Sequence, residues 1–107
     1  MAGGRRSRKK PDVPKARRAA EASRLEQIPN IAKALAADLR LIGIAHPRQL
    51  KRRNALNLYR ELCIARGARQ DPCVLDTFIA AVDFMNGGAP APWWTFTAAR
   101  KKQHPRL

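Results

Sequence analysis

The 107-residue sequence predicts an all-α protein. Three observations lead to this fold class. Apolar residues recur at spacings of three and four along several segments, which is the periodicity of a helix face. Those segments begin and end at residues typical of helix caps, namely Asn, Asp, Pro and Gly. No segment shows the apolar–polar alternation of a β-strand. The length suffices for one compact helical domain, which we place at residues 20–99.

Two helices are expected around a tight turn near the start of this domain. Residues 16–27 are rich in alanine and are expected to be helical. The turn follows at residues 29–32, and a second helix is expected over residues 32–42. Gly43 is expected to end that helix in a left-handed conformation, after which Ile44 returns to the core. The apolar face of the second helix consists of Ile31, Leu35, Leu39 and Ile42.

Two more helical segments are expected in the middle of the chain. Pro47 is suited to open a short helix over residues 46–51, because proline is tolerated in a first turn. Asn54 is a favourable N-cap for a longer helix over residues 55–66, which Gly67 would end. Its apolar stripe consists of Leu58, Tyr59, Leu62 and Cys63.

The last two helical segments have different signals. Asp71-Pro72 is the clearest helix start in the chain, because a capping acid precedes a proline at the first helical position. This helix is expected to run to Met85 and to stop at the following Asn-Gly-Gly. A stiff linker containing two prolines comes next, and residues 93–102 are expected to form a final helix.

Charge is distributed unevenly. Lys and Arg number 22 and Asp and Glu number 8, a net charge of +14. This excess is typical of proteins with a polyanionic partner, which means DNA, RNA or an anionic membrane surface. Residues 25–99 hold only nine basic and six acidic residues, so we expect a disordered basic arm over residues 1–19 and a flexible basic tail over residues 100–107. The arm residues expected to contact phosphates are Arg5, Arg6, Arg8, Lys9, Lys10, Arg17 and Arg18.

The sequence also indicates where the protein acts. No run approaches the ~20 apolar residues of a membrane span, and the N-terminus lacks the apolar region of a secretory signal. Two cysteines are expected to be free thiols in a reducing compartment. We therefore expect a cytoplasmic protein without membrane contact and without a cofactor.

The segment 25–39 resembles the helix-hairpin-helix motif, whose hairpin is usually apolar-Pro-Gly-Ile-Gly before a helix. In that family the turn amides and the next helix N-terminus hold a DNA phosphate without reading the bases. The resemblance implies a phosphate site here at Pro29, Asn30, Ile31, Ala32 and Lys33. Asn30 and Ala32 replace the two glycines. Asn tolerates a left-handed conformation, whereas the methyl group of Ala32 limits the approach of a phosphate.

A wider resemblance covers residues 25–102. Four blocks in order, at residues 28–33, 38–44, 58–63 and 71–78 with the later Trp93-Trp94, resemble a small bacterial family described as pathogenicity locus or mitomycin resistance proteins. The family's name implies a role in drug resistance or DNA repair.

Other candidate sites have more ordinary interpretations. Cys63 and Cys73 lack the paired spacing of a zinc site and are expected to be core residues, so no metal site is expected. Cys73 lies in a first helical turn, where the dipole can lower a thiol pKa, so a reactive Cys73 is an alternative. Trp93 and Trp94 are expected to pack over the core rather than to stack on unpaired bases. No pair of carboxylates is spaced for catalysis on one atom, so no catalytic residue is expected.

The leading functional hypothesis is therefore non-enzymatic, largely sequence-independent DNA binding through the hairpin and the basic arms, in DNA repair or resistance to DNA damage of the mitomycin type. The sequence does not determine whether the DNA is single- or double-stranded, or whether RNA is bound instead. An alternative is a protein-interaction adaptor of a repair or stress system. A further alternative is a thiol-dependent enzyme that uses Cys73.

Overall fold

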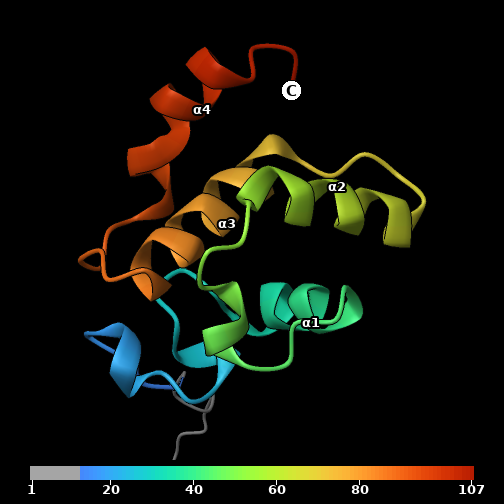
Figure 1. Cartoon of the computed structure of the whole chain (residues 1–107). Coiled ribbons are helices and arrows are strands. Elements are labelled where there is room, and N and C mark those ends of the chain that lie inside the picture. Colours follow the sequence, from blue (N-terminus) through green and yellow to red (C-terminus); the bar gives the residue numbers. More distant parts are fainter. Residues whose placement is uncertain (1–12) are drawn as a thin grey trace, which may run out of the picture.

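The structure, a computed structural model, describes residues 13–107. All regular secondary structure in this part of the chain is helical, which confirms the all-α fold class. Figure 1 shows α2 and α3 side by side, α1 beneath α2, and α4 above α3. The α-helices are α1 (Lys33–Leu41), α2 (Ala55–Arg66), α3 (Pro72–Met85) and α4 (Thr97–Gln103). Short 3₁₀ turns lie at Ala19–Glu21, Leu25–Gln27, Pro47–Leu50 and Trp93–Phe96.

Local caps place the ends of the two long helices. The Asn54 side chain accepts a hydrogen bond of 3.0 Å from the Asn57 N–H at the start of α2. The Asp71 carboxylate accepts one of 2.8 Å from the Cys73 N–H at the start of α3. Gly67 ends α2 in the left-handed conformation with φ of 68°. The predicted bounds of both helices are confirmed, because each signal acts within a few residues of its helix end.

The core forms around α3, which contacts α2, α4 and the 3₁₀ turns Pro47–Leu50 and Trp93–Phe96. Three residues around the turn, Leu25, Ile28 and Ile31, are completely buried, so the turn belongs to the core and is not a surface appendage. Ile44 is also buried, as predicted. The other fully buried large side chains include Leu39, Leu50, Leu58, Leu62, Leu75, Phe78 and Phe84.

The predicted helix over residues 16–27 is wrong. The segment instead contains two 3₁₀ turns joined by extended backbone, with φ −131° and ψ 147° at Arg24. The Gln27 side chain accepts hydrogen bonds from the backbone N–H groups of Ser23 and Arg24, at 2.9 and 2.8 Å, which fixes a non-helical path. The turn at residues 29–32 is thus preceded by a 3₁₀ turn instead of a helix, and it is followed by α1. The resemblance to a helix-hairpin-helix therefore rests on the sequence, because the first helix of that motif is not formed.

Packing extends on both sides beyond residues 20–99. Ala16 is buried, and its N–H donates a hydrogen bond of 2.8 Å to the Gln27 carbonyl. Arg100, which we expected in the flexible tail, is a buried residue of α4. Its guanidinium pairs with the buried carboxylate of Asp76 in α3, which is 24 residues away and could not be predicted from the neighbouring sequence. Five predicted arm contacts, Arg5, Arg6, Arg8, Lys9 and Lys10, lie outside the described residues.

Candidate nucleic-acid interface

The turn at residues 29–32 reverses the chain through one left-handed residue. Asn30 has φ of 73°, and the Ile31 N–H donates a hydrogen bond of 3.0 Å to the Ile28 carbonyl. Asparagine is one of the few non-glycine residues that visit this conformation readily. The expectation that Asn30 substitutes for a glycine in making the turn is confirmed.

The Asn30 side chain has a second role that the sequence analysis missed. Its Nδ2 donates a hydrogen bond of 2.8 Å to the Ala91 carbonyl, and its Oδ1 accepts one of 3.3 Å from the Trp93 N–H. One amide thereby holds the proline-containing linker that follows α3. A glycine at this position would make the same turn without the tether. The asparagine itself was the available signal, but its partners are 61 and 63 residues away.

The N-terminus of α1 opens directly from this turn. Ala32 is the N-cap, in extended conformation with φ −90° and ψ −175°, and it has no side-chain acceptor for the first N–H groups. The first turn of α1 contains no acidic residue. Ala32, Lys33 and Ala34 are all exposed. Since the first N–H groups of a helix have no intrahelical acceptor, they present partial positive charge to solvent here.

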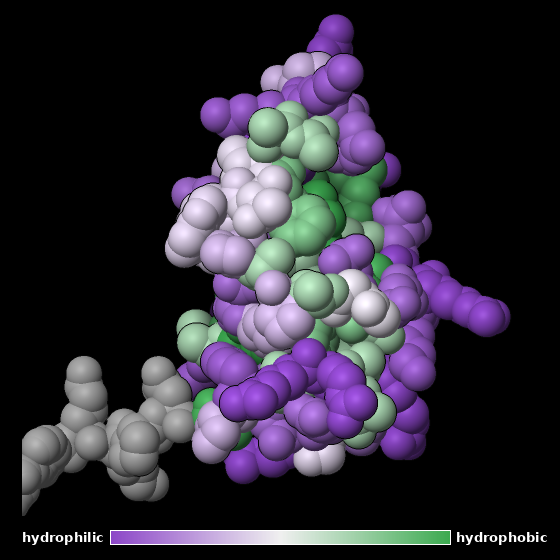
Figure 2. Space-filling view, turned by 90° about the vertical axis from the view of Figure 1, so that its left-hand side faces the viewer, coloured by the Kyte–Doolittle hydropathy of each residue, from purple (hydrophilic) through white to green (hydrophobic). Residues whose placement is uncertain are grey.

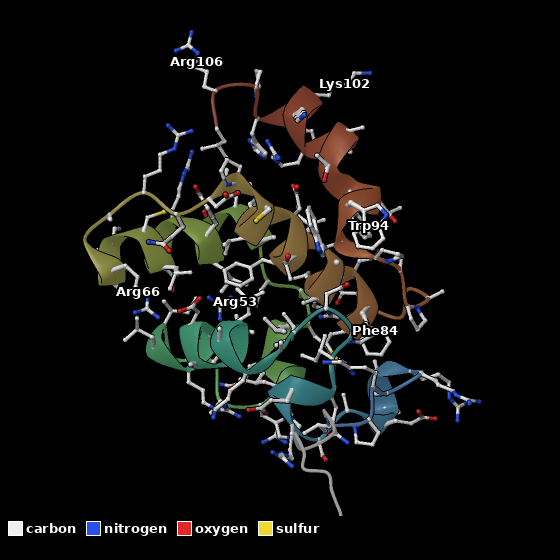
Figure 3. The ribbon with its side chains drawn as sticks, turned by 180° about the vertical axis from the view of Figure 1, so that it is seen from behind. Arg53, Arg66, Phe84, Trp94, Lys102 and Arg106 are labelled. Atoms are coloured by element: carbon white, nitrogen blue, oxygen red, sulfur yellow. The ribbon has the colours of Figure 1, made fainter. Side chains whose placement is uncertain are left out.

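Ion pairs join the 3₁₀ turn Leu25–Gln27 to α1 and join α1 to α2. The Glu26 and Arg40 side chains form two parallel hydrogen bonds of 2.9 Å, and this guanidinium lowers the pKa of Glu26 to about 2. In Figure 3, Arg66 of α2 lies on the side facing α1, where it pairs with Asp38. The charge of Arg40 is therefore neutralised inside the site. Lys33 remains as the exposed cation at the start of α1.

Lys15 also stabilises the turn. Its Nζ donates hydrogen bonds of 2.8 Å to the carbonyl of Glu26, before the turn, and to that of Ile31, within it. Two of the predicted phosphate contacts, Arg17 and Arg18, lie in the described part of the arm, and both are exposed. Arg18 pairs with Glu21 at 3.4 Å. The described part of the arm thus contributes one structural lysine and two exposed arginines.

Comparison with known proteins identifies the family. Residues 18–102 match the model of the family described as pathogenicity locus, Cdd1. The chain belongs to this family. It is also 38% identical over 82 residues to the mitomycin resistance protein McrB of Streptomyces lavendulae, and the match covers 77% of this chain and 78% of that protein. No solved structure matches the chain.

The part of the chain shared with the pathogenicity locus family includes the turn, the linker and most of α4. Membership confirms the resemblance inferred from the four sequence blocks. None of the helices in residues 13–107 is long and apolar enough to cross a membrane. Among those same residues, no group of three metal-ligating side chains comes together.

The thiol of Cys73 has the opposite tendency to the one expected at a helix start. Burial raises the pKa of Cys73 to about 11, and the neighbouring carboxylate of Asp71 acts in the same direction. The thiolate is therefore disfavoured at neutral pH. Cys63 is half-buried and accepts a hydrogen bond of 3.4 Å from the Gln70 N–H. Both are free cysteines.

The two tryptophans differ in environment. Trp93 is half-buried, whereas Trp94 is 63% exposed. Their rings meet edge to face, with centroids 5.7 Å apart and planes at 83°. The expectation that both pack over the core is wrong for Trp94, which faces solvent, and Trp93 is only half-buried.

Asp76 is a structural residue of α3. It is fully buried and accepts hydrogen bonds from Arg100 Nε at 2.7 Å, Arg100 Nη2 at 3.2 Å and Thr97 Oγ1 at 2.8 Å. This network fastens α4 to α3. It also explains why an acidic residue is tolerated in the core, since buried carboxylates require paired, hydrogen-bonded partners.

Proposed function

We propose that this member of the pathogenicity locus family binds DNA through phosphate groups, without reading base sequence. The observation that carries the proposal is the exposed N-terminus of α1, which has neither a side-chain cap nor an acid in its first turn. A phosphate oxygen placed there accepts hydrogen bonds from the first backbone N–H groups and is favoured by the helix dipole. Lys33 adds a full positive charge beside that position.

Contrast within the molecule supports this choice of site. The N-termini of α2 and α3 are closed by the side chains of Asn54 and Asp71, which occupy the N–H groups that a phosphate would need. The start of α1 keeps its N–H groups for an external acceptor. The side chains of Ile28 and Ile31 are completely buried and anchor the turn in the core.

The charge of the chain supports an anionic partner. The net charge is +14, and Arg40 and Arg100 are already paired within the fold. Other cations include Arg17, Arg18, whose pair with Glu21 is solvent-exposed, and those of residues 1–12. They would add affinity that falls steeply with salt and does not depend on sequence. The name of the McrB relative favours a role in resistance to DNA damage of the mitomycin type.

The sharpest test converts the open helix start into a capped one. Ala32→Asp places a carboxylate at the N-cap, where the extended backbone suits it, and should stabilise α1 by about 1 kcal/mol. The same carboxylate occupies the N–H groups and repels phosphate. We expect duplex affinity to fall by about tenfold or more, since a hydrogen bond to a charged group contributes about 1.5–3 kcal/mol. Binding is measured by fluorescence anisotropy over a series of salt concentrations.

Ala65→Asp is the matched control, because Ala65 is an exposed alanine of α2 and the substitution changes the net charge equally. It should alter affinity much less than Ala32→Asp. Lys33→Ala should weaken binding by a similar factor on DNA of any sequence. If Ala32→Asp and Ala65→Asp lowered DNA affinity equally, the turn would not be part of the DNA interface. Absence of DNA binding by the parent protein at low salt would favour the protein-interaction adaptor.

A further inference from the structure

An apolar groove of about 320 Å³ lies directly beside the turn. It is lined by Pro29, Asn30, Pro90, Ala91, Pro92 and Trp94. No lining residue carries a charge. The groove brings the turn before α1 together with the linker after α3, segments about 60 residues apart in the sequence. Figure 2 shows that the face turned to the viewer has apolar and weakly polar side chains over its middle, with hydrophilic ones above and below.

The ring of Trp94 is exposed but held in place. Figure 3 shows it beside the start of α4. Pro92 precedes the 3₁₀ turn with φ of −62°, and the Trp93 ring supports the Trp94 ring edge to face. The Asn30 amide ties the same linker to the turn through two hydrogen bonds. Trp94 thereby presents a large aromatic surface to solvent beside the turn.

A nucleic-acid base suits this groove better than a charged group does. Bases are flat, apolar on their faces and able to stack on tryptophan, whereas a charged side chain would lose hydration there without gaining a partner. The phosphate site proposed at the start of α1 begins two residues after Asn30. A base in the groove and a phosphate at Lys33 would therefore be neighbouring parts of one strand, and the net charge of +14 favours that strand over other aromatic ligands.

We infer that the groove between the turn and the linker binds an unpaired base, stacked on Trp94, so that the protein prefers DNA containing single-stranded nucleotides. The bases of an intact duplex are stacked on each other and do not reach such a groove. This inference rests on the proposed phosphate site, and it specifies which DNA the protein prefers, namely DNA with unpaired nucleotides. A proline-rich peptide is the competing occupant, because peptides of that kind also dock in grooves lined by aromatic residues.

The test compares an oligothymidylate strand with a fully paired duplex of the same length. Trp94→Ala should weaken binding to the single strand by roughly 5- to 140-fold, the range that corresponds to about 1–3 kcal/mol for one stacked base. Binding to the duplex should change by less than about twofold, because stacking contributes nothing to phosphate contacts. Trp94→Phe keeps an aromatic face and should retain most of the single-strand affinity.

Ile64→Ala is the control variant, since Ile64 is an exposed apolar residue of α2, 81% exposed, and does not line the groove. It should leave binding to both DNAs unchanged. Thermal melting of each variant checks the fold. Intrinsic tryptophan fluorescence should be quenched by oligothymidylate in the parent protein and much less in Trp94→Phe.

The outcomes separate the two proposals. Ala32→Asp should weaken single-strand and duplex binding alike, and its failure to do so refutes the phosphate site whatever Trp94 does. Normal binding of both DNAs by Trp94→Ala, or an equal loss on both, overturns the base-stacking groove and leaves the phosphate site standing. A fluorescence change with a polyproline peptide but none with oligothymidylate also overturns it and assigns the groove to a peptide.

Discussion

Replacing Arg100 by methionine tests whether this residue is a structural cation or a DNA-binding one. The parent side chain donates hydrogen bonds of 2.7 and 3.2 Å to a carboxylate that is completely buried. Arg100→Met removes both and leaves Asp76 with Thr97 alone. Breaking one partner of a buried ion pair costs about 3–5 kcal/mol of unfolding free energy. Because α4 has seven residues, its release would let water reach the carboxylate, so we expect a loss near the lower end, about 3 kcal/mol.

Urea denaturation followed by circular dichroism measures this loss. For a domain of this size, about 3 kcal/mol corresponds to a fall in the melting temperature of roughly 12–24 °C. Lys101→Met, at the exposed neighbour on α4, is the matched control and should cost less than about 0.5 kcal/mol. The double variant Asp76→Leu with Arg100→Met should regain most of the stability, because it leaves no buried charge. A loss in Arg100→Met no larger than that in Lys101→Met would refute the reasoning.

Two further predictions concern titratable groups. The pKa of Glu26 is lowered from its ordinary value near 4.5 to about 2, so its pairing with Arg40 stabilises the fold above about pH 4.5 and is lost as the pH falls toward 2. Because Arg40 is half-exposed, we expect the pair to contribute about 1 kcal/mol to the free energy of unfolding. Glu26→Gln should lack this contribution when stability is measured as a function of pH in the acid range. Identical pH profiles of the two proteins would contradict the pairing. Because the pKa of Cys73 is raised to about 11, native Cys73 should react with iodoacetamide much more slowly than free cysteine at neutral pH, and faster as the solution becomes more alkaline. Mass spectrometry of the labelled protein checks this, and rapid labelling of Cys73 at neutral pH would revive the thiol enzyme.

The features predictable from sequence are those whose causes lie within one or two helical turns. Asn54 and Asp71 each determine where a helix starts. Their side chains accept hydrogen bonds from N–H groups only two or three residues ahead, so the local sequence is enough to predict both starts. Gly43 and Asn30 adopt the left-handed conformation for equally local steric reasons. Together with the apolar periodicity, these signals suffice for the all-α class and for most helix bounds.

The sequence was a poor guide where side-chain chemistry depends on distant partners. The basic residues Lys15 and Arg100 looked alike as parts of flexible arms, but Lys15 binds carbonyls 11 and 16 residues away and Arg100 binds a carboxylate 24 residues away. One local contact was missed as well: the Gln27 side chain accepts hydrogen bonds from the N–H groups of Ser23 and Arg24, four and three residues away, and two short turns form where the alanine-rich composition predicted a helix.

The features of the candidate site also separate into those that the sequence predicts and those that depend on the tertiary structure. The turn, its left-handed Asn30 and the basic excess follow from the sequence by itself, because a dihedral preference and a net charge need no knowledge of packing. Only the tertiary structure decided that the Asn30 amide holds the linker, that Trp94 faces solvent and that both border one groove. These relations join residues about 60 positions apart, and the physical reason is that hydrogen bonding and burial depend on proximity in space, which chain order does not specify.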